Sequence, residues 1–130
     1  MNSTQKNESI IAGKAYAFAL DIIKLYKYLI NEKREFVLSK QILRSGTSIG
    51  ANINEAISAQ SKRDFVHKMS ISLKEARETI YWLRLLRDSD YISESDFSKM
   101  FITCNELIKI LTKIILTTKE KYFNKSNANL

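Results

Sequence analysis

The stretch that decides the fold is Gln41-x-x-Arg44-Ser45-x-x-Ser48-Ile49-x-x-Asn52-Ile53-x-Glu55. Its apolar residues Ile42, Ile49 and Ile53 recur at helical spacing, which predicts an amphipathic helix. A polar row runs beside them at steps of three and four, although serine and asparagine are indifferent helix formers. Such a row is either a hydrogen-bonded seam against a neighbouring helix or a reactive site, and we favour the seam.

Two glycines in the same stretch indicate close helix packing. Gly46 and Gly50 each cost a helix about 1 kcal/mol relative to alanine, but they let another helix approach closely. The chain has three glycines in all and no proline, and Gly13 also lies in a periodic segment. Because sheets need turn residues that this composition lacks, the predicted fold is all-α.

Hydrophobic periodicity predicts four long helices in one domain, 1–130. They cover about residues 7–31, 35–60, 62–88 and 94–123. Short connectors predict antiparallel neighbours, and therefore an up-down-up-down four-helix bundle. Ser61 and Ser93 are suited to cap the last two helices, since an acid follows each of them three residues later. We expect the ends, 1–5 and 124–130, to be disordered.

The predicted helices carry apolar rows that should face a common core. The rows of the first, third and fourth helices are Ile11, Ala15, Phe18, Ile22, Leu25 and Leu29; Phe65, Met69, Leu73, Ala76, Ile80 and Leu83; and Phe97, Phe101, Cys104, Ile108, Leu111 and Ile115. A second row of the first helix contains Tyr16, Leu20, Ile23 and Ile30. Two rows on one helix indicate burial on more than one side.

Bulk composition bounds the class of protein. The net charge of +7 favours a polyanionic partner without requiring one. No apolar run approaches the roughly 20 residues of a membrane span, and the polar N-terminus lacks the core of a signal peptide. The single cysteine, Cys104, lies among apolar residues and cannot form an internal disulfide. We therefore expect a reduced cytoplasmic protein, away from membranes, with a structural cysteine.

Catalytic chemistry finds little support in the sequence. His67 and Cys104 are the only residues of their kinds, so a metal cluster of histidines and cysteines is excluded. No phosphate-binding loop or dinucleotide fingerprint occurs, and Glu75 and Glu78 are more typical of an ion-paired helix face. The sequence predicts a protein that is not an enzyme and has neither cofactor nor metal.

The predicted third helix carries a polar, basic stripe away from its core row. The stripe contains Arg63, His67, Ser70, Lys74, Arg77, Tyr81 and Arg84. One interpretation is a solvated outer face. The other is a nucleic-acid site, because cations along a rod can meet successive phosphates and Tyr81 can stack on an unpaired base. We expect Arg63, Lys74, Arg77, Tyr81 and Arg84 to form that site.

Ile71, Trp82 and Leu85 lie on the same helix, far from its core row. A tryptophan and two aliphatic residues on a nominal outer face are typical of a subunit interface. Together with the second row of the first helix, they predict a homo-oligomer.

The spaced motif resembles one family. Arg44-Ser45-x-x-Ser48-Ile49-x-x-Asn52-Ile53-x-Glu55 is followed by Arg63-Asp64-Phe65 and Ala76-x-Glu78. This pattern resembles small bacterial four-helix-bundle proteins encoded in intervening sequences of large-subunit ribosomal RNA genes. A related branch comprises the accessory variability determinant proteins of diversity-generating retroelements. The resemblance spans about residues 12–118, but Ala56 stands where the family usually has glycine.

The resemblance implies a ring-shaped homopentamer. In the retroelement branch it implies binding to nucleic acid and to a reverse transcriptase. It marks Arg44, Ser48, Asn52 and Glu55 as structural signature positions, and we expect Asn52 and Glu55 to be at least partly buried. The leading hypothesis is a non-enzymatic, oligomeric accessory protein that binds RNA or DNA. The alternative is a protein-interaction scaffold, with a reverse transcriptase as candidate partner.

Overall fold

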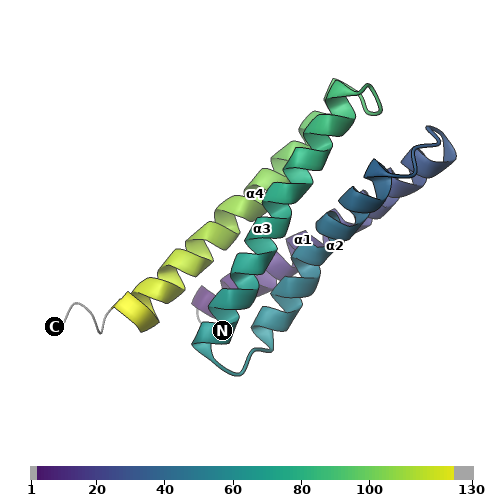
Figure 1. Cartoon of the computed structure of the whole chain (residues 1–130). Helices are drawn as coiled ribbons and strands as arrows, with labels where there is room; N and C mark the ends of the chain where they lie inside the picture. The colour runs from purple at the N-terminus through teal and green to yellow at the C-terminus, as the bar shows by residue number, and fades with distance from the viewer. Residues whose placement is uncertain (1–2, 125–130) are drawn as a thin grey trace.

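A computed structural model describes residues 3–124 of the 130-residue chain (Figure 1). These residues form α1 (Ser3–Asn31), α2 (Leu38–Ile57), α3 (Lys62–Asp88) and α4 (Glu94–Lys119), followed by a π-helical turn at Glu120–Asn124. Within the described range there is no strand. The prediction of an all-α protein with four long helices is confirmed.

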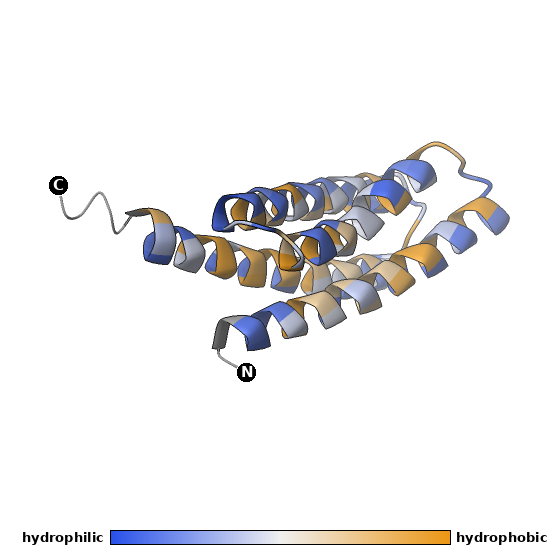
Figure 2. Cartoon of the chain, turned by 90° about the horizontal axis from the view of Figure 1, so that it is seen from below, coloured by the Kyte–Doolittle hydropathy of each residue, from blue (hydrophilic) through white to orange (hydrophobic). Residues whose placement is uncertain are grey.

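The helices pack around one core. α2 contacts both α1 and α3, α3 contacts α4, and α4 contacts α1. The connectors before α2 and before α4 lie at one end of the molecule, and the connector between α2 and α3 lies at the other (Figure 1). In Figure 2 the helices carry both hydrophobic and hydrophilic residues along their length, as the amphipathic pattern requires.

The predicted core row of α1 is correct. Its members Ile11, Ala15, Phe18, Ile22 and Leu29 are fully buried, and only Leu25 is half-buried. The second row behaves differently. Tyr16 and Leu20 are exposed, while Ile23 and Ile30 are half-buried, so within a single chain α1 is buried on one side only.

The core row of α3 contains two polar residues that the pattern did not predict. Ser72 and Thr79 are fully buried, whereas Leu73 and Ile80, which were expected in the core, are half-buried. The small side chains face α2, which approaches closely on that side. Hydrophobic periodicity missed them because it ranks leucine and isoleucine above serine and threonine.

α2 begins three residues later than predicted because Glu35 acts as its cap. The buried Glu35 carboxylate accepts hydrogen bonds from the backbone N–H groups of Val37, Leu38 and Ser39, at 3.2, 3.1 and 2.7 Å. Just before it, Arg34 has a φ of 54°, which breaks the helical path between α1 and α2. Burial alone would raise the pKa of Glu35, but the hydrogen bonds from the α2 backbone together lower it by more. The net pKa of Glu35 therefore lies below its ordinary value of 4.5.

The other helix ends follow the sequence more closely. Ser61 and Ser93 accept hydrogen bonds from the N–H groups of Asp64 and Asp96, both at 3.0 Å, which confirms them as caps. α2 ends at Ile57 instead of residue 60. Residues 3–5 and 124, where we expected disorder, are helical, and the remaining end residues lie outside the described range.

Replacing the α2 cap gives a pH-dependent prediction. Glu35→Gln should lower the free energy of unfolding by about 1 kcal/mol at neutral pH, since it removes a charged cap. The pKa of Glu35 is lower in the folded protein than in the unfolded chain, so its charged form stabilises the fold. This stabilisation is complete above the pKa of the unfolded chain and is lost as the pH falls through the pKa of the folded protein. The difference between wild type and variant should therefore shrink below about pH 4.5, measured by urea unfolding across pH. A difference that persists unchanged in acid would contradict the charged-cap role.

Gly46 allows α1 and α2 to pack closely. A Cβ atom built on Gly46 would lie 2.6 Å from Cγ1 of Ile22, a side chain that is fully buried and cannot move aside. The same atom on Gly50 would lie 3.5 Å from the Cβ of Ala15, an ordinary van der Waals contact. Only the first of the two glycines is therefore required by packing.

This difference predicts opposite effects for two matched substitutions. Gly46→Ala should destabilise the protein by roughly 1–3 kcal/mol, because overpacking forces the helices apart. Gly50→Ala should be neutral or stabilising by up to about 1 kcal/mol, because alanine is the better helix former. Thermal unfolding of both variants measures the contrast, and equal melting temperatures would contradict it.

Candidate functional site

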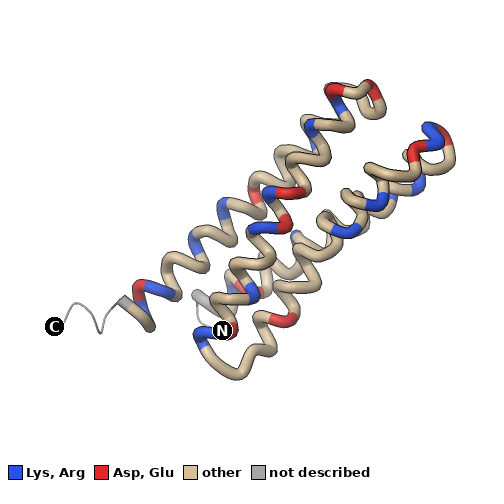
Figure 3. Tube along the Cα trace, in the orientation of Figure 1, with Lys and Arg blue, Asp and Glu red and all other residues tan. Residues whose placement is uncertain are grey.

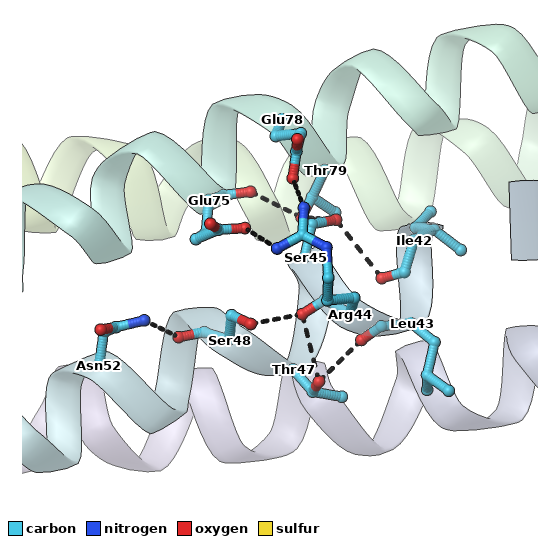
Figure 4. A network of polar contacts seen from close by, with 10 residues as sticks. All are labelled: Ile42, Leu43, Arg44, Ser45, Thr47, Ser48, Asn52, Glu75, Glu78 and Thr79. Carbon is cyan, nitrogen blue, oxygen red and sulfur yellow. Dashed lines mark hydrogen bonds and ion pairs between the residues drawn. The ribbon is translucent and has the colours of Figure 1, made fainter. Parts of the chain in front are cut away.

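Buried hydroxyl groups join α2 to α3 (Figure 4). The Ser45 and Thr79 hydroxyl oxygens lie 2.9 Å apart, and Thr79 Oγ1 lies 2.8 Å from the carbonyl oxygen of Glu75. Farther along, the Ser72 hydroxyl donates to the carbonyl oxygen of Ile49 at 2.8 Å. A buried hydroxyl without a partner is costly, so these contacts specify which residues of the two helices lie opposite each other.

Arg44 extends this interface to the surface. Its guanidinium donates to Glu75 at 3.3 Å and to Glu78, both on α3 (Figure 4). The Arg44 side chain is 51% exposed, whereas that of Glu75 is only 15% exposed. Burial alone would lower the pKa of Arg44, but the two carboxylates raise it by more. The net pKa of Arg44 is therefore raised above its ordinary value. The two acids singled out in the sequence therefore form an interhelical ion-pair cluster.

The remaining signature residues make local contacts. The Ser48 hydroxyl donates to the carbonyl oxygen of Arg44 at 2.6 Å, and Asn52 Nδ2 donates to that of Ser48 at 2.8 Å, both within α2. Asn52 is half-buried, as expected. Glu55 is exposed, contrary to expectation, because it lies at the edge of the interface, where its carboxylate pairs with Lys68 at 3.3 Å.

The basic stripe lies on the exposed side of α3. Arg63, Lys74, Arg77, Tyr81 and Arg84, together called the basic face below, are all exposed. Their four cations have no ion-pair partner among residues 3–124. Figure 3 shows Lys and Arg recurring along α3 and α4.

The other charges of α3 are largely engaged. Lys68 pairs with Glu55, and Arg87 Nε lies 2.9 Å from Asp88 Oδ1. Glu75 and Glu78 are held by Arg44. Interhelical and local ion pairs thus occupy most of the acids of α3, whereas the cations of the basic face, like Lys62, form no ion pair within residues 3–124.

The predicted interface residues are less exposed than their spacing suggested. Ile71, Trp82 and Leu85 are each half-buried. Trp82 packs against the core, and its ring meets that of Tyr81 edge-on with centroids 5.1 Å apart. The Trp82 indole N–H is buried and has no hydrogen-bond acceptor within the described part of the chain. Trp82 therefore serves the bundle itself, whatever it contributes to an assembly.

The two residues with the most catalytic potential lie apart. His67 is exposed, whereas Cys104 is fully buried and donates its thiol to the carbonyl oxygen of Ala76 at 3.3 Å. Burial raises the pKa of Cys104 to about 12, so a thiolate is absent at neutral pH. Residues 3–124 contain no group of three His, Cys, Asp or Glu side chains that could hold a metal ion. No described helix is long and apolar enough to cross a membrane.

Comparison with known proteins places the chain in a family. The model of the 23S rRNA-intervening sequence protein family matches residues 7–113. The chain belongs to this family. The match includes α2, α3 and the ion-pair cluster between them, so the spaced motif that carried the resemblance lies inside the family domain.

A solved structure agrees with this assignment. The chain is 50% identical to a protein of unknown function from the S23 ribosomal protein family of Bacteroides thetaiotaomicron VPI-5482. The match covers 84% of this chain and 97% of the solved one, with a TM-score of 0.83. No curated protein matches the chain.

The contacts predict unequal roles for the signature residues. Arg44→Ala should cost roughly 1 kcal/mol, because two neighbouring carboxylates, one of them mostly buried, lose their shared cation. Asn52→Ala should change the free energy of unfolding by less than about 0.5 kcal/mol, because Asn52 donates only to its own helix and alanine is the better helix former.

Chemical denaturation of both variants measures this contrast. Arg44→Ala combined with Glu78→Gln should recover part of the loss, since one of the repelling charges is removed. An Asn52→Ala variant that is destabilised more than Arg44→Ala would show that the polar row, and not the ion-pair cluster, joins the helices.

Proposed function

We propose that this protein is a non-enzymatic, oligomeric accessory protein of the cytoplasm that binds nucleic acid, RNA or DNA, through its basic face. The observation that carries the proposal is the lack of any ion-pair partner, among residues 3–124, for the four exposed cations Arg63, Lys74, Arg77 and Arg84. A row of unpaired cations along one helix can bind the successive phosphates of a nucleic acid. Such binding uses many phosphate contacts and does not depend on the base sequence.

The spacing of these cations suits an extended polyanion. Arg63 and Arg84 stand about 30 Å apart along α3, at 1.5 Å per residue. Lys74 and Arg77 lie between them on the same side. Tyr81, which is 51% exposed, adds an aromatic surface for an unpaired base.

Assembly is part of the proposal. The protomer is taken as an up-down-up-down bundle that repeats in a ring-shaped homopentamer. Tyr16 and Leu20 on α1 are exposed and apolar, and Ile71 and Leu85 on α3 are half-buried. These residues are the candidate subunit contacts. A ring would multiply the basic faces, so weak individual contacts would add up to useful affinity.

The alternative is a protein-interaction scaffold. The exposed apolar side chains on α1 and α4, such as Tyr16 at 67% and Ile102 at 65%, can also receive a protein partner. In a relative of the retroelement branch that partner would be a reverse transcriptase. A scaffold would bind through apolar residues, with weak dependence on salt.

The nucleic-acid proposal predicts a steep dependence on salt. Binding of single-stranded RNA should weaken with a log–log slope of about −0.7 for each phosphate neutralised. Arg77→Glu with Arg84→Glu should abolish binding while the melting temperature stays close to that of wild type, because both residues are exposed and unpaired within the described chain. Fluorescence anisotropy measures the binding.

The matched control reverses two other cations. Lys109→Glu with Lys113→Glu makes the same change in net charge on exposed residues of α4, so it tests net charge alone. If both double variants lose binding, the effect comes from net charge and the basic face is not the specific binding site. If RNA, single-stranded DNA and duplex all fail to bind wild type at low salt, the scaffold alternative replaces the proposal.

The assembly also has a direct test. Light scattering should give a mass that is a multiple of 15.0 kDa, with five copies proposed. Leu85→Glu should dissociate the assembly, since a buried unpaired charge in an interface costs several kcal/mol. Ile57→Glu, at the other end of the bundle and 42% exposed, should leave the mass unchanged. A wild-type monomer at micromolar concentration would contradict the ring.

A further inference from the structure

The connector between α1 and α2 presents apolar side chains to solvent. Phe36 is 49% exposed and Val37 is 70% exposed. Tyr28, in the last turns of α1, is 40% exposed. Figure 2 shows the connector passing from a hydrophilic to a hydrophobic segment before α2 begins. Large apolar side chains grouped at one end of a molecule mark an interaction site more often than chance exposure.

The connector is held in one conformation. The Glu35 carboxylate accepts three backbone hydrogen bonds from the start of α2, and the Glu35 N–H donates to the carbonyl oxygen of Leu29 at 2.9 Å. Glu35 itself is only 9% exposed. Phe36 follows directly, so the position of its backbone is set by the fold. A backbone that is already ordered loses little entropy when a ligand binds beside it.

Each of the two aromatic rings has a cation over it. The Arg34 guanidinium carbon lies 5.6 Å from the centroid of the Phe36 ring, and Lys33 Nζ lies 5.9 Å from that of Tyr28. Between residues 27 and 40 the exposed charges are four cations and one acid, Lys27, Lys33, Arg34, Lys40 and Glu32. The charge of Glu35 is directed into the backbone of α2. The chain on either side of Phe36 is therefore basic as well as aromatic.

Exposed aromatic rings beside cations favour a ligand that carries both negative charge and planar rings. Unpaired bases stack on aromatic rings, arginine adds a cation–π contribution, and the flanking phosphates need cations. A duplex hides the faces of its bases and satisfies only the charge. We infer that Phe36 and Arg34 form a stacking platform for an unpaired base of single-stranded nucleic acid. The inference rests on the proposed function and refines it, because single strands become the preferred ligand.

The platform lies at a useful place in the bundle. The connector lies at the same end as the C-terminal end of α3 (Figure 1). A strand that follows the basic face from Arg63 toward Arg84 therefore runs toward that end.

The test compares two ligands with equal charge. One is a short oligothymidylate, and the other is an abasic oligonucleotide of the same length, which keeps the phosphates and lacks the bases. Phe36→Ala should weaken binding of oligothymidylate about tenfold, as expected for loss of one base–aromatic stack. The same variant should bind the abasic strand like wild type. Phe36→Tyr should retain binding of both.

Val37→Ala is the matched control, because Val37 is the next residue, is more exposed and has no π-face. It should bind both ligands like wild type. A 2-aminopurine base within the strand should be quenched by wild type and not by Phe36→Ala. Duplex of the same length should bind wild type more weakly than oligothymidylate does.

Several results would overturn the platform. These are unchanged oligothymidylate binding by Phe36→Ala, equal weakening on both ligands, or a lower oligomer mass that makes Phe36 a subunit contact. If Arg77→Glu with Arg84→Glu abolishes binding while Phe36→Ala has no effect, the platform fails and the proposed function stands. If wild type binds no nucleic acid, both fail.

Discussion

The close approach of α2 to two neighbours is the constraint on which the rest of the structure depends. Gly46 leaves the space that the buried Ile22 of α1 occupies, and Ser45 meets Thr79 of α3 through a buried hydroxyl contact. Adjacent residues on a helix point about 100° apart, at 3.6 residues per turn, so one dipeptide serves two different helix pairs. Larger side chains at either position would separate α2 from a neighbour and open the core.

Close packing of α2 and α3 also determines which charged side chains of α3 form ion pairs. Because α2 and α3 lie so near each other, Arg44 reaches both Glu75 and Glu78, and Glu55 reaches Lys68. The carboxylates of Glu75 and Glu78 are therefore paired with a residue of α2. Lys74, Arg77 and Arg84 are exposed on the same helix and form no ion pair among the described residues. The seam that stabilises the fold thus produces the basic face that the proposed function uses.

The candidate site was predictable to the extent that it depends on one helix. Heptad steps placed the cations of α3 on a single stripe, and the structure has them exposed on one helix. Their lack of partners was not predictable, since it depends on ion pairs between α2 and α3. The same reason explains Trp82. Its spacing placed it outside the core row, yet it packs against the core, beside the ring of Tyr81.

The start of α2 was predicted three residues too early for a related reason. Glutamate is not a common helix cap, so nothing in the pattern marked Glu35 as the residue that starts α2. Its role depends on its burial and on the three backbone N–H groups at the start of α2 that donate to its carboxylate.

By itself the sequence determined the fold class, the four helices, the caps at Ser61 and Ser93 and the apolar row of α1. These features follow from local propensity and from periodicity within a single helix. Only the tertiary structure decided which glycine is indispensable, which hydroxyls are buried and which charges remain unopposed. Those properties depend on distances between helices, which a one-dimensional pattern does not contain.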